Sequence, residues 1–247
     1  MRKNKIIYYF IGLSTWLSLF ACSKESPCFK STGKIISENR IITNEITSID
    51  LKDNIDLVIR QDSIASIKIE AGENLLPFIK VRQKGNQLEL KNDNQCNFLR
   101  SYKNNITAYL SLPNIDYIYY TGHGNISTTG ALQLNNFIFE TRNGTGTVSL
   151  QLNANKISIL QHTGPVDFEL SGTSNFAYLF SGGGGWMRCQ QLISDKVHVN
   201  HDGTGDVIVS PTNELLIELT SLGNIEYYGN PTLTVSKHSG SGKIIKR

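Results

Sequence analysis

The sequence is poor in cysteine and in charge, and each shortage excludes a class of protein. Only four cysteines occur and none forms a Cys-x-x-Cys pair, so the ligand spacing of a structural zinc site is missing. Charged residues make up 18% of the chain, and Arg2, Lys3 and Lys5 lie in a predicted leader. Removing that leader reduces the 24 basic residues to 21, which balance the 21 acidic ones. A neutral mature chain gives no electrostatic basis for binding nucleic acid, so no nucleic-acid partner is expected.

Motifs for phosphate, dinucleotide and calcium binding are also missing. The segment Gly240–Lys243 is followed by Ile244 instead of Ser or Thr, and it lacks the spacing of a P-loop. The run from Gly182 to Gly185 has no further glycine at the spacing of a dinucleotide-binding turn. The glycine period is about twice the nine residues of a calcium-binding β-roll. We therefore expect no cofactor and no metal.

Residues 1–21 have the pattern of a signal peptide. A basic start is followed by an apolar run from Ile6 to Phe20, which is short for a membrane span. The segment Leu19–Cys22 resembles the lipobox of bacterial lipoproteins, in which the cysteine receives a diacylglyceryl group before cleavage. We expect lipidation of Cys22, with a membrane as the partner that the lipid contacts. An ordinary secretory signal with a coincidental cysteine is the alternative.

The mature chain is expected to begin with a tether over residues 22–34, which is polar and lacks periodicity. Once Cys22 is lipidated, Cys28, Cys96 and Cys189 remain, and the sequence does not determine their pairing. The expected location is the cell envelope, with the lipid in the outer membrane. The sequence leaves open whether the protein faces the cell surface or the periplasm.

A glycine turn returns throughout the second half of the chain. Its second glycine falls at 124, 146, 164, 184, 205, 223 and 242, and successive differences are 22, 18, 20, 21, 18 and 19. A period near 20 with glycine at a fixed phase is typical of stacked repeats. In the two weaker copies, His162 and Ser221 take the place of the first glycine. The predicted turn glycines are Gly122, Gly124, Gly144, Gly146, Gly164, Gly182, Gly184, Gly203, Gly205, Gly223, Gly240 and Gly242.

Between the turns, apolar residues alternate at period two, which predicts two short strands per repeat. The expected fold is all-β: a right-handed parallel β-helix with coils of about 20 residues and no substantial helix after the signal peptide. One domain over 35–247 is expected, with irregular β coils over 35–113 and Gly-x-Gly repeats over 114–247. Glycine would supply positive φ and close stacking at the corners. The alternative is an antiparallel meander or sandwich with hairpin turns at Gly-x-Gly.

Three features together resemble the head GIN domain family of putative auto-transporter adhesins, from about Ile46 to the end. One is Asp56–Gln61 followed by Ala71–Leu76. Another is Leu110–Pro113 leading into the first glycine turn. The third is the series of corners that ends with Ser239–Gly242. The resemblance implies a β-helical fold on secreted or lipid-anchored bacterial proteins, and it brings no catalytic residues to carry over.

Tyrosines are the best candidates for a ligand site, because tyrosine joins a large apolar ring to a hydrogen-bonding tip that suits contact with sugars. Trp186, by contrast, occupies an inward position of its repeat and is expected in the core. The candidate ligand-binding residues are Tyr117, Tyr119, Tyr120, Tyr227 and Tyr228.

The predicted function is a non-catalytic module of a lipid-anchored envelope protein, which serves adhesion or ligand binding at the cell surface. The expected partner is a glycan or a surface protein. One alternative is a polysaccharide lyase or hydrolase on the same scaffold, and another is a purely structural envelope protein. An enzyme would need acids that converge on one face. The acids available for such a cluster are Asp195, Asp202, Asp206, Glu218 and Glu226.

Overall fold

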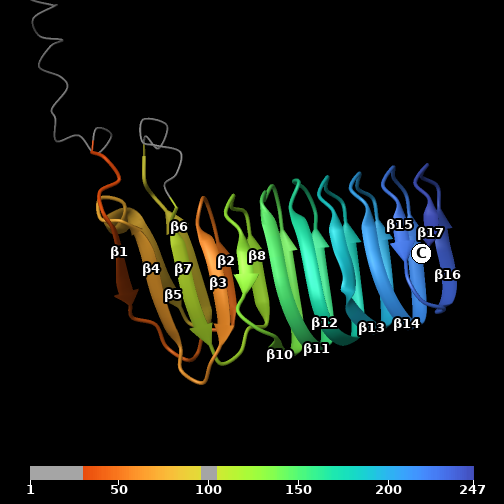
Figure 1. Ribbon diagram of the computed structural model, residues 1–247, viewed down its shortest axis with the longest axis horizontal. Helices are drawn as coiled ribbons and strands as arrows, with labels where there is room; N and C mark the ends of the chain where they lie inside the picture. Colours follow the sequence, from red (N-terminus) through yellow and green to blue (C-terminus); the bar gives the residue numbers. More distant parts are fainter. Residues whose placement is uncertain (1–29, 96–104) are drawn as a thin grey trace, which may run out of the picture.

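The computed structural model describes residues 30–95 and 105–247, which form a β-solenoid. Strands stack coil upon coil along one axis, with β1 at one end and the C-terminus at the other (Figure 1). The only helical segment among the described residues is the 3-10 turn η2 (Leu76–Phe78). Within these same residues, no helix has the length and apolarity needed to cross a membrane.

The strands differ in length between the two halves of the chain. The first half contains β1 (Ile35–Arg40), β2 (Ser48–Leu51), β3 (Asp56–Gln61), β4 (Ser66–Gly72), β5 (Ile79–Lys84), β6 (Gln87–Asn92), β7 (Thr107–Leu112), β8 (Tyr117–Tyr120) and β9 (Ile126–Thr128). The second half contains β10 (Leu132–Thr141), β11 (Thr147–Gln161), β12 (Asp167–Ser181), β13 (Met187–His201), β14 (Val207–Leu219), β15 (Ile225–Tyr227), β16 (Thr232–His238) and β17 (Ile244–Lys246).

Each coil has two sides, because the long strands bend near their middle. The first residues of β14 pair with β15, whereas its last residues pair with the separate strand β16. We call one side face A; it runs from β5 through β6, β2 and β8 to the second halves of β10–β14 and to β16. Face B runs from β1 through β4, β7, β3 and β9 to the first halves of β11–β14, then β15 and β17.

The register confirms parallel coils of about 20 residues. Ile157 pairs with Ala177, Ala177 with Val197 and Val197 with Leu215, which are 20, 20 and 18 residues apart. The hairpin alternative is therefore wrong for the repeat region. Antiparallel pairs occur only toward the N-terminal end of the described chain, where β1, β4 and β7 pair in this way, as do β5 and β6.

The core follows from period-two alternation, because every second side chain of both faces points into the coil. Equivalent residues of successive coils lie in register, so they form continuous columns. Tyr120, Phe139 and Phe168 illustrate this packing: their rings meet edge to face, with centroids 6.2 Å and 5.3 Å apart. Leu233 and Val235 keep the inward register but are 40% and 43% exposed, because β16 lies at the open end of the stack.

Glycines stack at the corners in two columns. A β-carbon on Gly183 or Gly203 would collide with the carbonyl oxygen of the glycine one coil earlier in the first column, Gly164 or Gly183 respectively. The second column contains Gly185 and Gly205, which collide with the Val166 and Gly185 carbonyls in the same way. Close approach of the coils therefore excludes side chains at these positions.

Two parts of the glycine prediction were wrong. Among the predicted turn glycines, only Gly146 and Gly164 have positive φ, so close approach rather than backbone angle is the general reason for glycine. The predicted positions of the glycines within two repeats are also wrong. Gly164 lies in the first column, so His162 does not take a glycine's place. Gly183 and Gly185, instead of Gly182 and Gly184, are the members of the two columns. In the first case Val166 takes the second-column place that a glycine has in other coils. In the second case the corner is shorter: six residues separate paired positions 141 and 148 or 161 and 168, but five separate 181 and 187.

The same shift overturns the core position expected for Trp186. Met187 takes the inward position, paired with Phe168 and Val207 and fully buried. Trp186 is 39% exposed, and its ring lies 5.1 Å from the Arg188 guanidinium.

Two adjacent glycines test the stacking constraint. We expect Gly185→Ala to lower the free energy of unfolding by about 1–3 kcal/mol, because the new β-carbon overlaps the Val166 backbone. Gly184→Ala should change it by less than about 0.5 kcal/mol, because the nearest atom to its β-carbon is Thr204 Oγ1 at 3.5 Å. Both changes restrict the unfolded chain equally, so urea unfolding of the pair isolates the folded-state clash. Equal losses in the two variants would contradict the stacking argument.

Candidate functional site

The outward side of face A is rich in aromatic and aliphatic side chains, which is unusual for a surface of alternating strands. These residues belong to β8, β10, β11, β12 and β14, which lie in register, whereas β13 has Lys196, His198 and Asn200 at the equivalent positions. A contiguous apolar patch on a surface marks an interaction site more often than scattered apolar residues do. We call this patch the aromatic face, and its members are Tyr117, Tyr119, Ile138, Leu160, Phe176, Tyr178, Phe180 and Leu216.

Strand β12 supplies the centre of the aromatic face. Phe176, Tyr178 and Phe180 alternate with the buried Ala177 and Leu179, so all three rings point outward and remain half-buried. Residues two apart on one strand are separated by about 6.6 Å, so the rings form a row. A row of fixed rings offers a flat apolar surface with little conformational entropy to lose on binding.

Neighbouring strands flank these rings with polar groups. The Lys156 ammonium lies 5.8 Å from the centre of the Phe176 ring, and the His198 ring lies 5.0 Å from that of Tyr178. His198 Nε2 is 2.9 Å from a carboxylate oxygen of Glu218. Hydrogen-bonding groups beside an apolar surface are the combination found in ligand sites.

At the β8 side, Glu140 joins the tyrosines to a histidine. The Tyr117 hydroxyl donates a 2.8 Å hydrogen bond to Glu140 Oε2, and His162 Nε2 lies 3.3 Å from Glu140 Oε1. Burial, together with the bond to Glu140, raises the pKa of Tyr117 above its ordinary value of 10.0. The His162 ring lies 5.4 Å from that of Phe180, so this carboxylate edge is continuous with the central rings.

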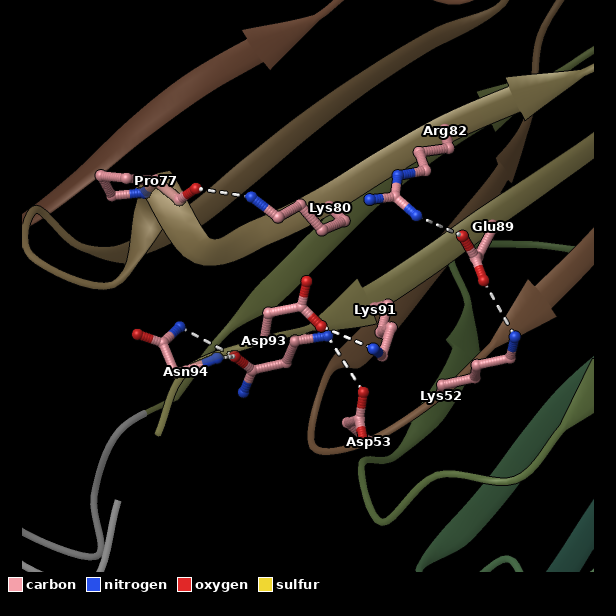
Figure 2. A network of polar contacts seen from close by, with 10 residues as sticks. Lys52, Asp53, Pro77, Lys80, Arg82, Glu89, Lys91, Asp93 and Asn94 are labelled. Atoms are coloured by element: carbon pink, nitrogen blue, oxygen red, sulfur yellow. Dashed lines mark hydrogen bonds and ion pairs between the residues drawn. The ribbon is translucent and has the colours of Figure 1, made fainter. Parts of the chain in front are cut away.

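The aromatic face ends in a charged cluster toward the N-terminus, of which Figure 2 shows Lys52, Arg82 and Glu89. Lys52 contacts Glu89 at 2.9 Å and Asp50 at 3.0 Å, and Arg82 lies 3.7 Å from Glu89. The hydrogen bond from Lys52 lowers the pKa of the Glu89 carboxyl. Asp50 pairs in register with Tyr119, so the charged cluster and the aromatic face share one surface.

Face B differs in chemistry over the same coils. Its outward column is mainly hydroxyl and charged, with ion pairs such as Arg188 to Asp167 at 3.2 Å. The column contains Ser127, Ser149, Glu169, Arg188, Ile208 and Glu226. The two faces have the same backbone, so this contrast arises from the choice of outward side chains.

The predicted tyrosine platform is only partly assembled. Tyr117 and Tyr119 lie on the aromatic face, but Tyr120 is fully buried, and its hydroxyl donates to the carbonyl oxygens of Gly124 and Thr145 at 2.6 Å each. Tyr227 belongs to β15 on face B, packs against the core and is followed by the exposed Tyr228. Tyr120 is therefore a core residue, and the other two tyrosines form no joint site with β8.

Comparison with known proteins agrees with this architecture. The family described as putative auto-transporter adhesin, head GIN domain, matches residues 45–231. The chain belongs to this family. A search of curated proteins found no relative of it.

Solved structures share the fold of this head GIN domain. A putative adhesin from Bacteroides fragilis NCTC 9343 superposes with a TM-score of 0.76 at 23% identity, over 88% of this chain and 100% of that one. A putative lipid binding protein from Parabacteroides distasonis ATCC 8503 gives 0.69 at 17% identity, over 88% and 99%. A putative adhesin from the same organism gives 0.63 at 17% identity, over 88% and 100%.

The acids proposed for an enzyme do not come together in the head GIN domain. Each has a separate partner: Asn213 for Asp195, Thr220 for Asp202, the Asn224 amide for Asp206, His198 for Glu218 and Arg247 for Glu226. Glu218 lies on face A, whereas Glu226 lies on face B. Within the described ranges, no group of three or more His, Cys, Asp or Glu side chains is placed to hold a metal.

Two predicted cysteine roles fall largely outside the described residues. Cys22, Cys28 and Cys96 lie there, so the structure does not place the lipidation site or two of the three remaining thiols. Cys189 is a free thiol of β13, and burial raises its pKa to about 12. Such a thiol is unreactive, because the thiolate is the nucleophilic form.

Sequence reasoning missed the central rings of the aromatic face. The pattern identified Ala177 and Leu179 as inward residues, and the same alternation places Phe176, Tyr178 and Phe180 outside. The available signal was an aromatic residue at every outward position of one strand. Which other side chains adjoin these rings required the register between coils.

A column of polar residues lies buried beneath the glycine corners. Thr141, Gln161, Ser181 and His201 pair in register at the ends of successive strands, and all are 0% exposed. Gln161 Nε2 donates to the Val166 carbonyl at 2.7 Å, so this member of the column serves a corner carbonyl that points inward. The hydroxyls of Thr141 and Ser181 have no hydrogen-bond partner among the described residues. Burial lowers the pKa of His201 below its ordinary value of 6.5, so His201 is neutral at pH 7.

His201 should make stability depend on pH. A lowered folded-state pKa means that the unfolded chain binds the proton more tightly, so stability is kept above about pH 6.5 and lost as pH falls below it. We expect the free energy of unfolding of the unmodified chain to fall relative to His201→Gln between about pH 7 and 5, by at most about 1.4 kcal/mol per pH unit. Glutamine fits the column, as Gln161 shows. Parallel pH profiles of the two chains would contradict the buried, neutral assignment.

Proposed function

We propose that this head GIN domain is a non-catalytic adhesion module of a lipid-anchored cell-envelope protein, and that its aromatic face binds a glycan. The observation that carries the proposal is the row of Phe176, Tyr178 and Phe180, flanked by hydrogen-bonding side chains. Sugar rings combine apolar C–H faces with a rim of hydroxyls, which match aromatic rings and their polar neighbours respectively. The family's adhesin description supports a place on the cell envelope.

A non-catalytic role is favoured over the hydrolase alternative by the placement of acids. General acid–base cleavage of a glycosidic bond needs two carboxyl groups about 5–10 Å apart across the scissile bond. The two acids that contact the histidines beside the central rings are Glu140 and Glu218, which lie on β10 and β14, with β11, β12 and β13 between them. Strands are spaced about 4.8 Å apart, so these two carboxylates are separated by about 19 Å along the stack. That separation suits contacts along a bound chain.

Loss of a central ring should weaken glycan binding. We expect Tyr178→Ser to reduce affinity for array-identified glycans about tenfold, the effect of losing about 1.4 kcal/mol at a central aromatic contact. The matched control is Ile208→Ser, which also removes an outward apolar side chain from a long strand, but on face B. The measurement is a glycan array with the processed chain, followed by calorimetry on each hit. Absence of glycan binding, or equal losses in both variants, would refute the assignment.

Lipid anchoring is tested separately by mass spectrometry of the chain expressed in a bacterial host. We expect a diacylglyceryl group on the N-terminal cysteine and partition of the chain into membranes, because acyl chains supply about 0.8 kcal/mol per buried methylene. Cys22→Ser should remain unprocessed and carry no lipid, whereas Cys28→Ser should be lipidated normally. A lipid that persists in the first variant would show that another residue is the anchor.

A further inference from the structure

Face B contains a groove of about 470 Å³ near the N-terminal end of the solenoid. It lies over β4, β7 and β3, on the opposite side of the coil from the aromatic face. Ser66 pairs with Ser111, and Ser111 pairs with Arg60, so two short side chains lie between longer neighbours. The hollow exists because these serines do not fill the outward surface, and its volume is within the range of about 300–1,000 Å³ typical of ligand sites.

The groove is positively charged. Of its lining residues, Arg60 and Lys68 are cationic and none is acidic. Hydroxyl groups of Ser66, Ser111 and Tyr109 lie around them. Cations and hydroxyls that converge on a hollow without carboxylates favour an anionic, hydroxyl-rich ligand.

An aromatic ring forms part of the wall. Tyr109 is 37% exposed, and the Lys68 ammonium lies 4.7 Å from its ring centre. The two residues are directly opposite in the antiparallel pair of β4 and β7, so the backbone fixes both. A ring with an ammonium beside it can contact the C–H face of a sugar while the cation contacts an acidic substituent.

Lys68 is less constrained by carboxylates than the arginines of face B. Arg188 is held by Asp167 and Arg247 by Glu226. Lys68 has no carboxylate partner among the described residues. Arg60 contacts Asp62 at 2.7 Å, with 61% of the Arg60 side chain and 38% of the Asp62 side chain exposed, and such surface pairs exchange readily for another anion.

We propose that this groove is a second binding site, specific for an acidic sugar unit, that is, a ring that carries a carboxylate or a sulfate ester. Lys68 and Arg60 bind the anionic group, Tyr109 contacts the ring, and the two serines bind sugar hydroxyls. The site is separate from the aromatic face, so it gives the module a charge-selective contact on its other side.

The proposal is tested by calorimetry with the processed full chain at low salt. The probes are a galacturonic acid trisaccharide and its methyl ester, a sulfated galactose trisaccharide and its unsulfated form, and inorganic sulfate. We expect at least one acidic trisaccharide to bind about tenfold more tightly than its neutral partner and than sulfate, with affinity that falls as salt is added. Comparison of the two acidic probes shows which anion the groove selects.

Matched variants locate the site. Lys68→Gln and Arg60→Gln should each weaken binding of the acidic probe about tenfold. Arg188→Gln, which removes an outward cation of face B outside the groove, should change it by less than about twofold. Thermal unfolding checks that the three variants fold equally. Equal binding of neutral and acidic probes, sulfate binding as tight as the sugar, or an equal loss in Arg188→Gln would overturn the proposal.

Discussion

The close approach of one coil to the next is the constraint on which this structure depends. Parallel strands hydrogen-bond at about 4.8 Å, and the corners must keep that spacing as well. At Gly185 and Gly205 the preceding carbonyl occupies the place of a β-carbon, so only glycine fits. The same spacing brings equivalent residues of successive coils into contact, so the side chains at one position of the repeat form a column along the solenoid. The core, the buried polar column and both outer faces are products of that repetition.

In each coil the residues that stabilise the fold are different from those that form its outer surface. Inward residues such as Ala177 and Leu179 hold the coils together, whereas the outward residues between them are free to serve contacts. Face A uses this freedom for rings and face B for hydroxyls and ion pairs, although both have the same backbone. A rigid surface of this kind suits adhesion, because its side chains are already ordered before a partner arrives.

The glycine corners account for polar side chains such as Tyr120 and Gln161 inside the coil. A tight corner directs some carbonyls inward, and each needs a donor because an unpaired buried carbonyl is costly. Tyr120 and Gln161 donate to such carbonyls in their own coils. Leu219 occupies the equivalent position one coil after His201, which shows that the requirement varies with local corner geometry. A tyrosine that looks like a ligand contact in the sequence is thus a structural residue.

The sequence by itself determined the class of fold, because a glycine period near 20 and period-two apolar alternation are local patterns that only stacked coils satisfy together. It did not separate Tyr117 and Tyr119, which lie on the surface, from Tyr120, which is buried. Corner length decided the rest: one residue fewer before Met187 moved Trp186 to the surface and changed which glycines stack. Assembly of the aromatic face and of the Tyr109 groove depends on register between coils, a long-range property that no single repeat contains, so only the tertiary structure could show it.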